Sequence, residues 1–335
     1  MKKKKLILLL CCSLAAGKAE AHDIISSRYS YREHVLPILE AHCVRCHSPD
    51  GPAPFRLTSY RDARPQAVAI KEEVLLRNMP PWYAEEGQHK LIGEHRLSAA
   101  EVDIIVEWAS GGAPEGKRTP GGSTPETIKP PEVADLELEL PEQILLPGKQ
   151  RETVRLTIET GLSETAWITG WELGGARADL LRSGSLYRVR IAPENYLGTR
   201  MNIDGKLSWA AGAKLEAGED LALSILYTRP WTLGDKRESV RGRLRIWLSK
   251  TRPKLLLHAR ALGETHSLPP GSRLFGVLPS TPMKLKASGE TEDLIEVFAA
   301  PGHWPLLYRF NETLKISGKL EVSPKTRGIV LYTAP

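Results

Sequence analysis

The residues best able to do chemistry are Cys43, Cys46 and His47, which form a Cys-x-x-Cys-His pattern. Two thiols at this spacing lie about one helical turn apart, so they can form thioether bonds with the two vinyl groups of a haem. The adjacent imidazole can then reach the iron as an axial ligand. The pattern therefore predicts one covalently attached haem c, with His47 bound to the iron.

Two other chemistries use pairs of cysteines, namely zinc binding and thiol redox exchange. Structural zinc needs about four converging ligands, and residues 22–335 contain no cysteine besides Cys43 and Cys46. A thioredoxin-like redox site would need a strand pattern around the pair, whereas the flanking residues have helical periodicity. Haem attachment is therefore the better supported interpretation.

The second axial ligand must come from elsewhere in the chain. Met79 is the one methionine in residues 22–112, and Pro80 and Pro81 follow it directly. Because prolines restrict the backbone, they can hold the Met79 thioether in place across the haem from His47. A methionine can also serve only as a flexible core residue. If Met79 does so, His89 and His95 are the alternative ligands.

Three helices are expected to position these residues. They run from Tyr31 towards Cys46, from about Asp62 to Arg77, and from Ser98 to Gly111-Gly112. The third begins with Ser98-Ala99-Ala100-Glu101, which is a capping box, and ends at a glycine pair. Residues 22–112 are therefore predicted to form a small α-helical domain around the haem.

Residues 28–116 resemble a bacterial cytochrome c module. The likeness is carried by Val35-Leu36-Pro37-Ile38-Leu39, Cys43-Val44-Arg45-Cys46-His47, Tyr60-Arg61-Asp62-Ala63-Arg64-Pro65, Met79-Pro80-Pro81-Trp82, Arg96-Leu97-Ser98, Trp108 and Gly112-Ala113-Pro114-Glu115-Gly116. The resemblance implies that His47 and Met79 are the axial ligands and that Trp82 packs beside the haem. In that family the module is typically fused to a copper type II, ascorbate-dependent monooxygenase-like domain.

The chain changes character after residue 112. Residues 111–131 contain five glycines and five prolines, so residues 113–135 are expected to form a linker. From residue 136 the apolar residues alternate, as in Leu136-Glu137-Leu138, Leu221-Ala222-Leu223 and Leu244-Arg245-Ile246. Many short alternating strands predict an antiparallel β-sandwich or jelly roll of two packed units over residues 136–335. The expected fold class is multidomain, α plus all-β.

Residues 136–335 also resemble the double jelly-roll copper monooxygenase domain. The matching segments include Glu164-Thr165-Ala166-Trp167, Trp171-Glu172-Leu173, Leu226-Tyr227-Thr228 and Met283-Lys284-Leu285. Where that family carries copper-binding histidines, this chain has Arg182-Ser183, Leu226 and Pro279-Ser280-Thr281-Pro282, and its own His258, His266 and His303 are scattered. Because type II copper needs imidazole ligands, we expect this domain to bind no copper.

Residues 1–21 have the features of a signal peptide. A positive stretch, Lys2 to Lys5, precedes the apolar run Leu6 to Leu14 and the cleavage pattern Ala19-Glu20-Ala21. That run is far shorter than the roughly 20 residues that span a bilayer. We therefore expect cleavage before His22, a periplasmic or extracytoplasmic protein, and no membrane span in the mature chain.

The charge of the chain argues against a nucleic-acid partner. The formal net charge is +6, but residues 1–21 carry five lysines and one acid and so account for +4 of it. The remaining +2 is too small a balance to indicate a phosphate-binding surface.

Taken together, these features predict an exported monohaem c-type cytochrome that transfers single electrons between redox partner proteins. Its β domain would be a non-catalytic docking module. One alternative is a copper- and ascorbate-dependent monooxygenase with a fused haem electron donor, which the missing imidazoles oppose. The other is a haem-containing sensor or scaffold subunit, which a labile sixth ligand would favour.

Overall fold

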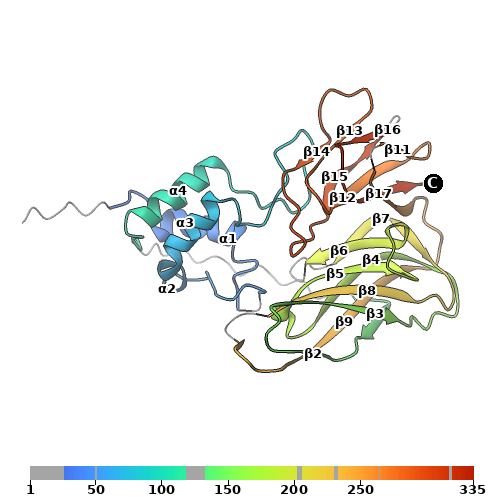
Figure 1. Cartoon of the computed structure of the whole chain (residues 1–335), viewed down its shortest axis with the longest axis horizontal. Helices are drawn as coiled ribbons and strands as arrows, with labels where there is room; N and C mark the ends of the chain where they lie inside the picture. The colour runs from blue at the N-terminus through green and yellow to red at the C-terminus, as the bar shows by residue number, and fades with distance from the viewer. Residues whose placement is uncertain are drawn as a thin grey trace, which may run out of the picture.

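A computed structural model describes residues 26–49, 51–117, 133–201, 206–229, 233–263, 265–316 and 319–335. The expected signal peptide, residues 1–21, and residues 118–132 of the expected linker lie outside the described residues. Helices gather at one end of the molecule and strands at the other (Figure 1). None of the described helices combines the length and hydrophobicity that crossing a membrane requires.

The helical region consists of short segments. They are η1 (Tyr31–Val35), α1 (Leu36–His42), α2 (Tyr60–Ala63), η2 (Arg64–Gln66), α3 (Ala67–Leu75) and α4 (Ala99–Ser110). The first expected helix ends at His42, and the chain continues to Cys46 as hydrogen-bonded turns. The second is interrupted at Pro65, which lies in η2 between α2 and α3. Proline lacks the N–H that a continuous α-helix uses, which explains the break.

The helices pack around an apolar core of their own. Tyr31, Ile105 and Trp108 are fully buried in it. The residues after α4 are tied to this core because Trp108 Nε1 donates to the carbonyl of Pro114 at 3.1 Å and the Tyr60 hydroxyl donates to the carbonyl of Ala113 at 2.9 Å.

Most of the regular structure is β strand. The strands of the first half are β1 (Leu136–Glu139), β2 (Gln143–Leu145), β3 (Arg151–Ile158), β4 (Ala166–Ala176), β5 (Leu181–Arg188), β6 (Tyr196–Met201), β7 (Leu207–Leu215), β8 (Leu221–Thr228) and β9 (Glu238–Ser249). Those of the second half are β10 (Leu256–Ala261), β11 (Thr265–Ser267), β12 (Arg273–Pro279), β13 (Met283–Ala287), β14 (Ile295–Val297), β15 (Tyr308–Lys315), β16 (Lys319–Val322) and β17 (Gly328–Ala334). Short 3-10 turns, η3 (Ala178–Leu180) and η4 (Pro193–Asn195), precede β5 and β6.

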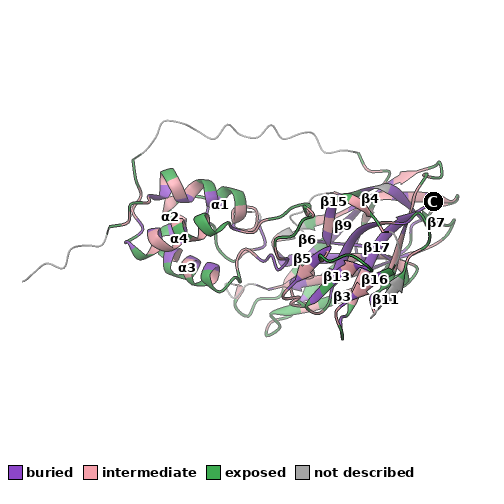
Figure 2. Ribbon diagram, turned by 90° about the horizontal axis from the view of Figure 1, so that it is seen from above, coloured by how far each residue is buried: buried purple, intermediate pink, exposed green. Residues whose placement is uncertain are grey.

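Two β sandwiches share one long sheet. Within the described residues, a nine-stranded sheet has the order β1-β9-β4-β7-β10-β17-β12-β15, with β2 also on β9. Its first half packs against the four-stranded sheet β3-β8-β5-β6, and its second half against β11-β16-β13-β14. The pairs are antiparallel except β7 with β10, and the buried residues concentrate within the strands (Figure 2). The expected antiparallel sandwich of two units is therefore confirmed, whereas its jelly-roll connectivity stays a prediction.

Residues 82–84, from the amino-terminal half of the chain, pack into the core of the second β sandwich. Trp82, Tyr83 and Ala84 are buried in the second sandwich among residues of β12 to β17. Ala84 forms a bridge with Val297, and the Tyr83 backbone N–H donates to the Tyr308 hydroxyl at 3.2 Å. Residues 82–84, expected within the helical domain of residues 22–112, thus join the helices to the sheets.

The start of α4 yields a stability prediction. The Ser98 hydroxyl accepts from the Glu101 N–H at 3.3 Å, and a Glu101 carboxylate oxygen accepts from the Ser98 N–H at 2.8 Å, which confirms the capping box. Removing the hydroxyl in Ser98→Ala leaves a helix N–H without its partner, so the free energy of unfolding should fall by about 1 kcal/mol. Denaturant titration followed by circular dichroism measures this.

A matched control lies at the other end of the same helix. Ser110→Ala removes an exposed hydroxyl that caps no helix N-terminus and should leave stability within about 0.5 kcal/mol of the starting protein. Equal stabilities for Ser98→Ala and Ser110→Ala would contradict the capping interpretation.

Candidate functional site

Cys43, Cys46, His47 and Met79 line one cavity of about 370 Å³. This volume falls within the roughly 300–1,000 Å³ typical of pockets for cofactors and small molecules. The cavity lies where the helical region meets the β region, because residues of both line it. Its walls are largely apolar, with Leu57, Ile70, Val74, Pro80 and Pro81 among the lining residues.

The turn that carries the two cysteines is held by backbone hydrogen bonds. The N–H groups of Cys46 and His47 both donate to the carbonyl of Cys43, at 3.0 and 2.9 Å. The chain then doubles back, and the N–H of Ala53 donates to the carbonyl of Cys46 at 3.2 Å. Gly51 permits this return, because a Cβ at that position would lie 2.0 Å from the Cys46 carbonyl oxygen.

His47 is oriented as a metal ligand would be. Its side chain is buried, and Nδ1 lies 3.0 Å from the carbonyl oxygen of Phe55. A carbonyl can only accept, so Nδ1 carries the hydrogen and Nε2 keeps its lone pair. Burial lowers the pKa of His47, the Phe55 hydrogen bond opposes that change, and the nearby charge of Arg182 lowers the pKa further. The imidazole is therefore held neutral, as metal ligation requires.

The environment of the two thiols does not match that of a redox dithiol. Cys43 and Cys46 are half-buried and are not joined in a disulfide. Burial, with a smaller effect of Cys46, raises the pKa of the Cys43 thiol to about 12. Redox cysteines need a lowered pKa because the thiolate is the reactive species. Across the described residues, no three His, Cys, Asp or Glu side chains converge as a zinc site would require.

Met79 reaches the cavity because α3 ends in a tight turn. After Leu75 the backbone takes the left-handed conformation at Arg77, with φ of 58°. The N–H groups of Asn78 and Met79 then donate to the carbonyl of Glu73, at 2.9 and 3.2 Å. These bonds satisfy a carbonyl of the last helical turn and direct the chain back towards the cavity.

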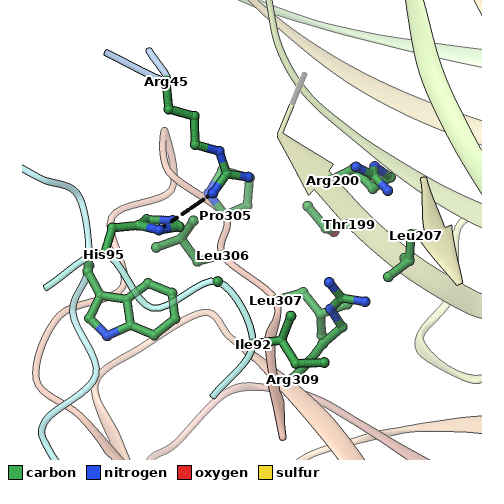
Figure 3. A pocket seen from close by; sticks show the side chains of 12 residues that line it. Arg45, Ile92, His95, Thr199, Arg200, Leu207, Pro305, Leu306, Leu307 and Arg309 are labelled. Carbon is green, nitrogen blue, oxygen red and sulfur yellow. Dashed lines mark hydrogen bonds between the residues drawn. The ribbon is translucent and has the colours of Figure 1, made fainter. Parts of the chain in front are cut away.

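The two alternative ligands, His89 and His95, lie outside the cavity that His47 and Met79 share. His95 lines a separate pocket of about 180 Å³ that also contains Arg45, Arg200 and Arg309 (Figure 3). Figure 3 shows the Arg45 guanidinium directed at the His95 ring, with Nη1 at 3.3 Å from Nε2. The rings of His89 and Phe310 form a T-shaped pair, with 5.9 Å between the centroids.

Trp82 is not among the residues that line the cavity of the two thiols. It is buried, and its ring centroid lies 5.2 Å from that of His95 and 5.1 Å from that of Tyr308. It shares a neighbouring pocket of about 260 Å³ with Met79 and Pro80. Its expected contact with a haem stays a prediction.

The β region contributes two lining residues that the sequence motifs did not indicate as site residues, Arg182 and Trp304. The Arg182 guanidinium lies over the Trp304 ring, 4.2 Å from its centroid. Both residues are far from Cys46 in the sequence, so the spacing of the haem motif could not predict that they line this cavity.

Of the positions compared with copper ligands, Arg182 lines the cavity, and the others belong to the strands and turns of the β region. Ser183 and Leu226 face each other as a cross-strand pair of β5 and β8, and Ser280 and Pro282 follow β12 in the turn to β13. His258 stacks on Tyr332 with 5.4 Å between the ring centroids. The side chain of His266 lies outside the described residues.

Comparisons with known proteins leave the family of this chain open. No protein-family model matches the sequence, and no curated protein matches it. The solved structures that are similar to part of it include a Cupin 2 conserved barrel domain protein from Leptotrichia buccalis and a protein from Parabacteroides distasonis proposed to be secreted. Each is 10% identical, and they cover 61% and 60% of this chain and 90% and 89% of their own, with TM-scores of 0.18 and 0.20.

Proposed function

We propose that the cavity holds one haem c, attached through thioethers to Cys43 and Cys46, and that the chain transfers single electrons. The observation that carries the proposal is that both thiols, the His47 imidazole and the Met79 thioether line one largely apolar cavity. When bound, the haem supplies an iron that gains or loses one electron.

The chain's own residues prepare this site in three ways. The Phe55 carbonyl fixes the tautomer and ring orientation of His47, as partners of metal-bound histidines commonly do. The carbonyl of Glu73 holds the backbone that presents Met79. The apolar walls limit water, which strengthens every electrostatic interaction within the cavity.

The proposal extends to place and partners. Residues 1–21 would direct the chain to the periplasm or another extracytoplasmic compartment, where haem c is attached. The electrons would come from and go to redox partner proteins. The β region would serve as a docking module and catalyse no reaction, since imidazoles are missing at the positions compared with copper ligands.

Covalent attachment is tested by denaturation. The mature protein, expressed with export and haem maturation, should keep haem mass after acid denaturation, because thioether bonds survive the loss of the fold. The variant Cys43→Ser, Cys46→Ser should release all haem under the same treatment. Intact mass spectrometry measures this, and haem retained by the double variant would refute thioether attachment.

Ligation by Met79 is tested with Met79→Leu. Leucine keeps the apolar volume but lacks sulfur, so the weak sulfur-to-iron band at the red end of the spectrum should disappear. The reduction potential should fall, because a thioether ligand favours the ferrous state. Met283→Leu, in the buried core of the second sandwich, is the matched control and should change neither property. An unaltered spectrum of Met79→Leu would instead favour His89 or His95.

The absence of copper chemistry is tested directly. After incubation with copper and removal of excess metal, the protein should hold well under one copper per chain, because arginine, serine, leucine and proline offer no imidazole. Elemental analysis and ascorbate-driven oxygen uptake measure this. One tightly held copper with ascorbate-dependent turnover would restore the monooxygenase alternative.

A further inference from the structure

Arg182 is directed into the cavity by an irregularity of its own strand. Along the β5–β8 ladder, Leu181 pairs with Tyr227 and Ser183 pairs with Leu226, so Arg182 is the extra residue of a bulge. Both of its neighbours, Leu181 and Ser183, are buried in the sandwich. Bulges re-aim side chains and occur often beside functional sites. Here the bulge lets a charged residue leave the sandwich core and line the cavity.

Two contacts hold the Arg182 side chain in this direction. Its Nε donates to the Thr228 hydroxyl at 3.3 Å, and its guanidinium lies over the Trp304 ring at 4.2 Å. Trp304 is buried and lines the same cavity. These contacts give the guanidinium a defined position, and the partial burial of Arg182 lowers its pKa.

Arg182 is a cation in the lining of a largely apolar cavity. Among the described residues no carboxylate forms an ion pair with Arg182. The side chains of Cys46 and His47 line the same cavity as Arg182. A half-buried cation without a counter-ion is costly. An anionic group on a molecule in the cavity would offset that cost.

We propose that Arg182 is the positively charged wall that the β region contributes to the haem site, where it pairs with a carboxylate of the bound haem and raises the haem's reduction potential. The inference rests on the proposed function. The sign follows from charge: the ferric site carries one more positive charge than the ferrous site, so a fixed cation nearby disfavours the ferric state. The effect is strong because the low-polarity cavity screens it poorly.

The test compares reduction potentials of purified, haem-loaded variants by spectroelectrochemical titration. Arg182→Gln should shift the ferric-to-ferrous equilibrium about tenfold towards ferric, which lowers the potential by about 59 mV for a one-electron couple. Arg182→Lys keeps the charge and should recover most of the difference. Arg155→Gln changes the net charge equally at an exposed position of β3, in the same four-stranded sheet, and should leave the potential unchanged.

The outcomes separate this inference from the proposed function. Wild-type protein without covalent haem overturns both. Haem-loaded wild type with equal potentials for Arg182→Gln and Arg155→Gln overturns the role of Arg182 alone, even if Arg182→Gln melts at a lower temperature. If Arg182→Gln does not accumulate, Trp304→Leu removes the ring that holds the guanidinium. Its potential should also fall, and an unchanged potential there counts against the inference.

Discussion

The packing of Trp82, Tyr83 and Ala84 into the second β sandwich is the interaction on which the cavity depends. These residues follow Met79 closely and join a core built from β12 to β17. Removing a buried aromatic side chain of this size typically costs about 3–5 kcal/mol. The same packing fixes where α3 ends relative to the sheets. Together with the bridge between Leu91 and Phe310, it holds the amino-terminal segment that follows Met79 against the second sandwich.

Local departures from regular structure aim the polar groups at the cavity. The left-handed turn at Arg77 reverses the chain after α3, and the close approach at Gly51 folds the loop after the cysteines. In the β region, the bulge of β5 places the Arg182 side chain in the lining of the cavity. In each case a regular helix or strand would have carried the side chain elsewhere.

The composition of the sequence and the packing of the structure place the boundary between the helical and β regions at different residues. The glycine- and proline-rich residues after 112 separate helical from alternating sequence, yet residues 82–84 already lie in a β core. On the proposed function, the β region then has a role beyond docking. It forms a wall of the haem cavity through Arg182 and Trp304, so changes in the sheets can reach the redox site.

Features that depend on residues close together in the chain could be predicted before the fold was known. Cys43, Cys46 and His47 carry their chemistry within five positions, Ser98 and Glu101 specify a helix start within one turn, and alternation from Leu136 onward specifies strands. Each signal depends on neighbours a few residues apart. Tertiary structure decided the rest: that the first helix stops at His42, that His95 lies in a pocket with Arg45, and that Arg182 and Trp304 meet opposite the cysteines. Those outcomes depend on packing between side chains from distant parts of the chain. Hydrophobic periodicity predicts which face of an element is buried, but not which other element packs against it.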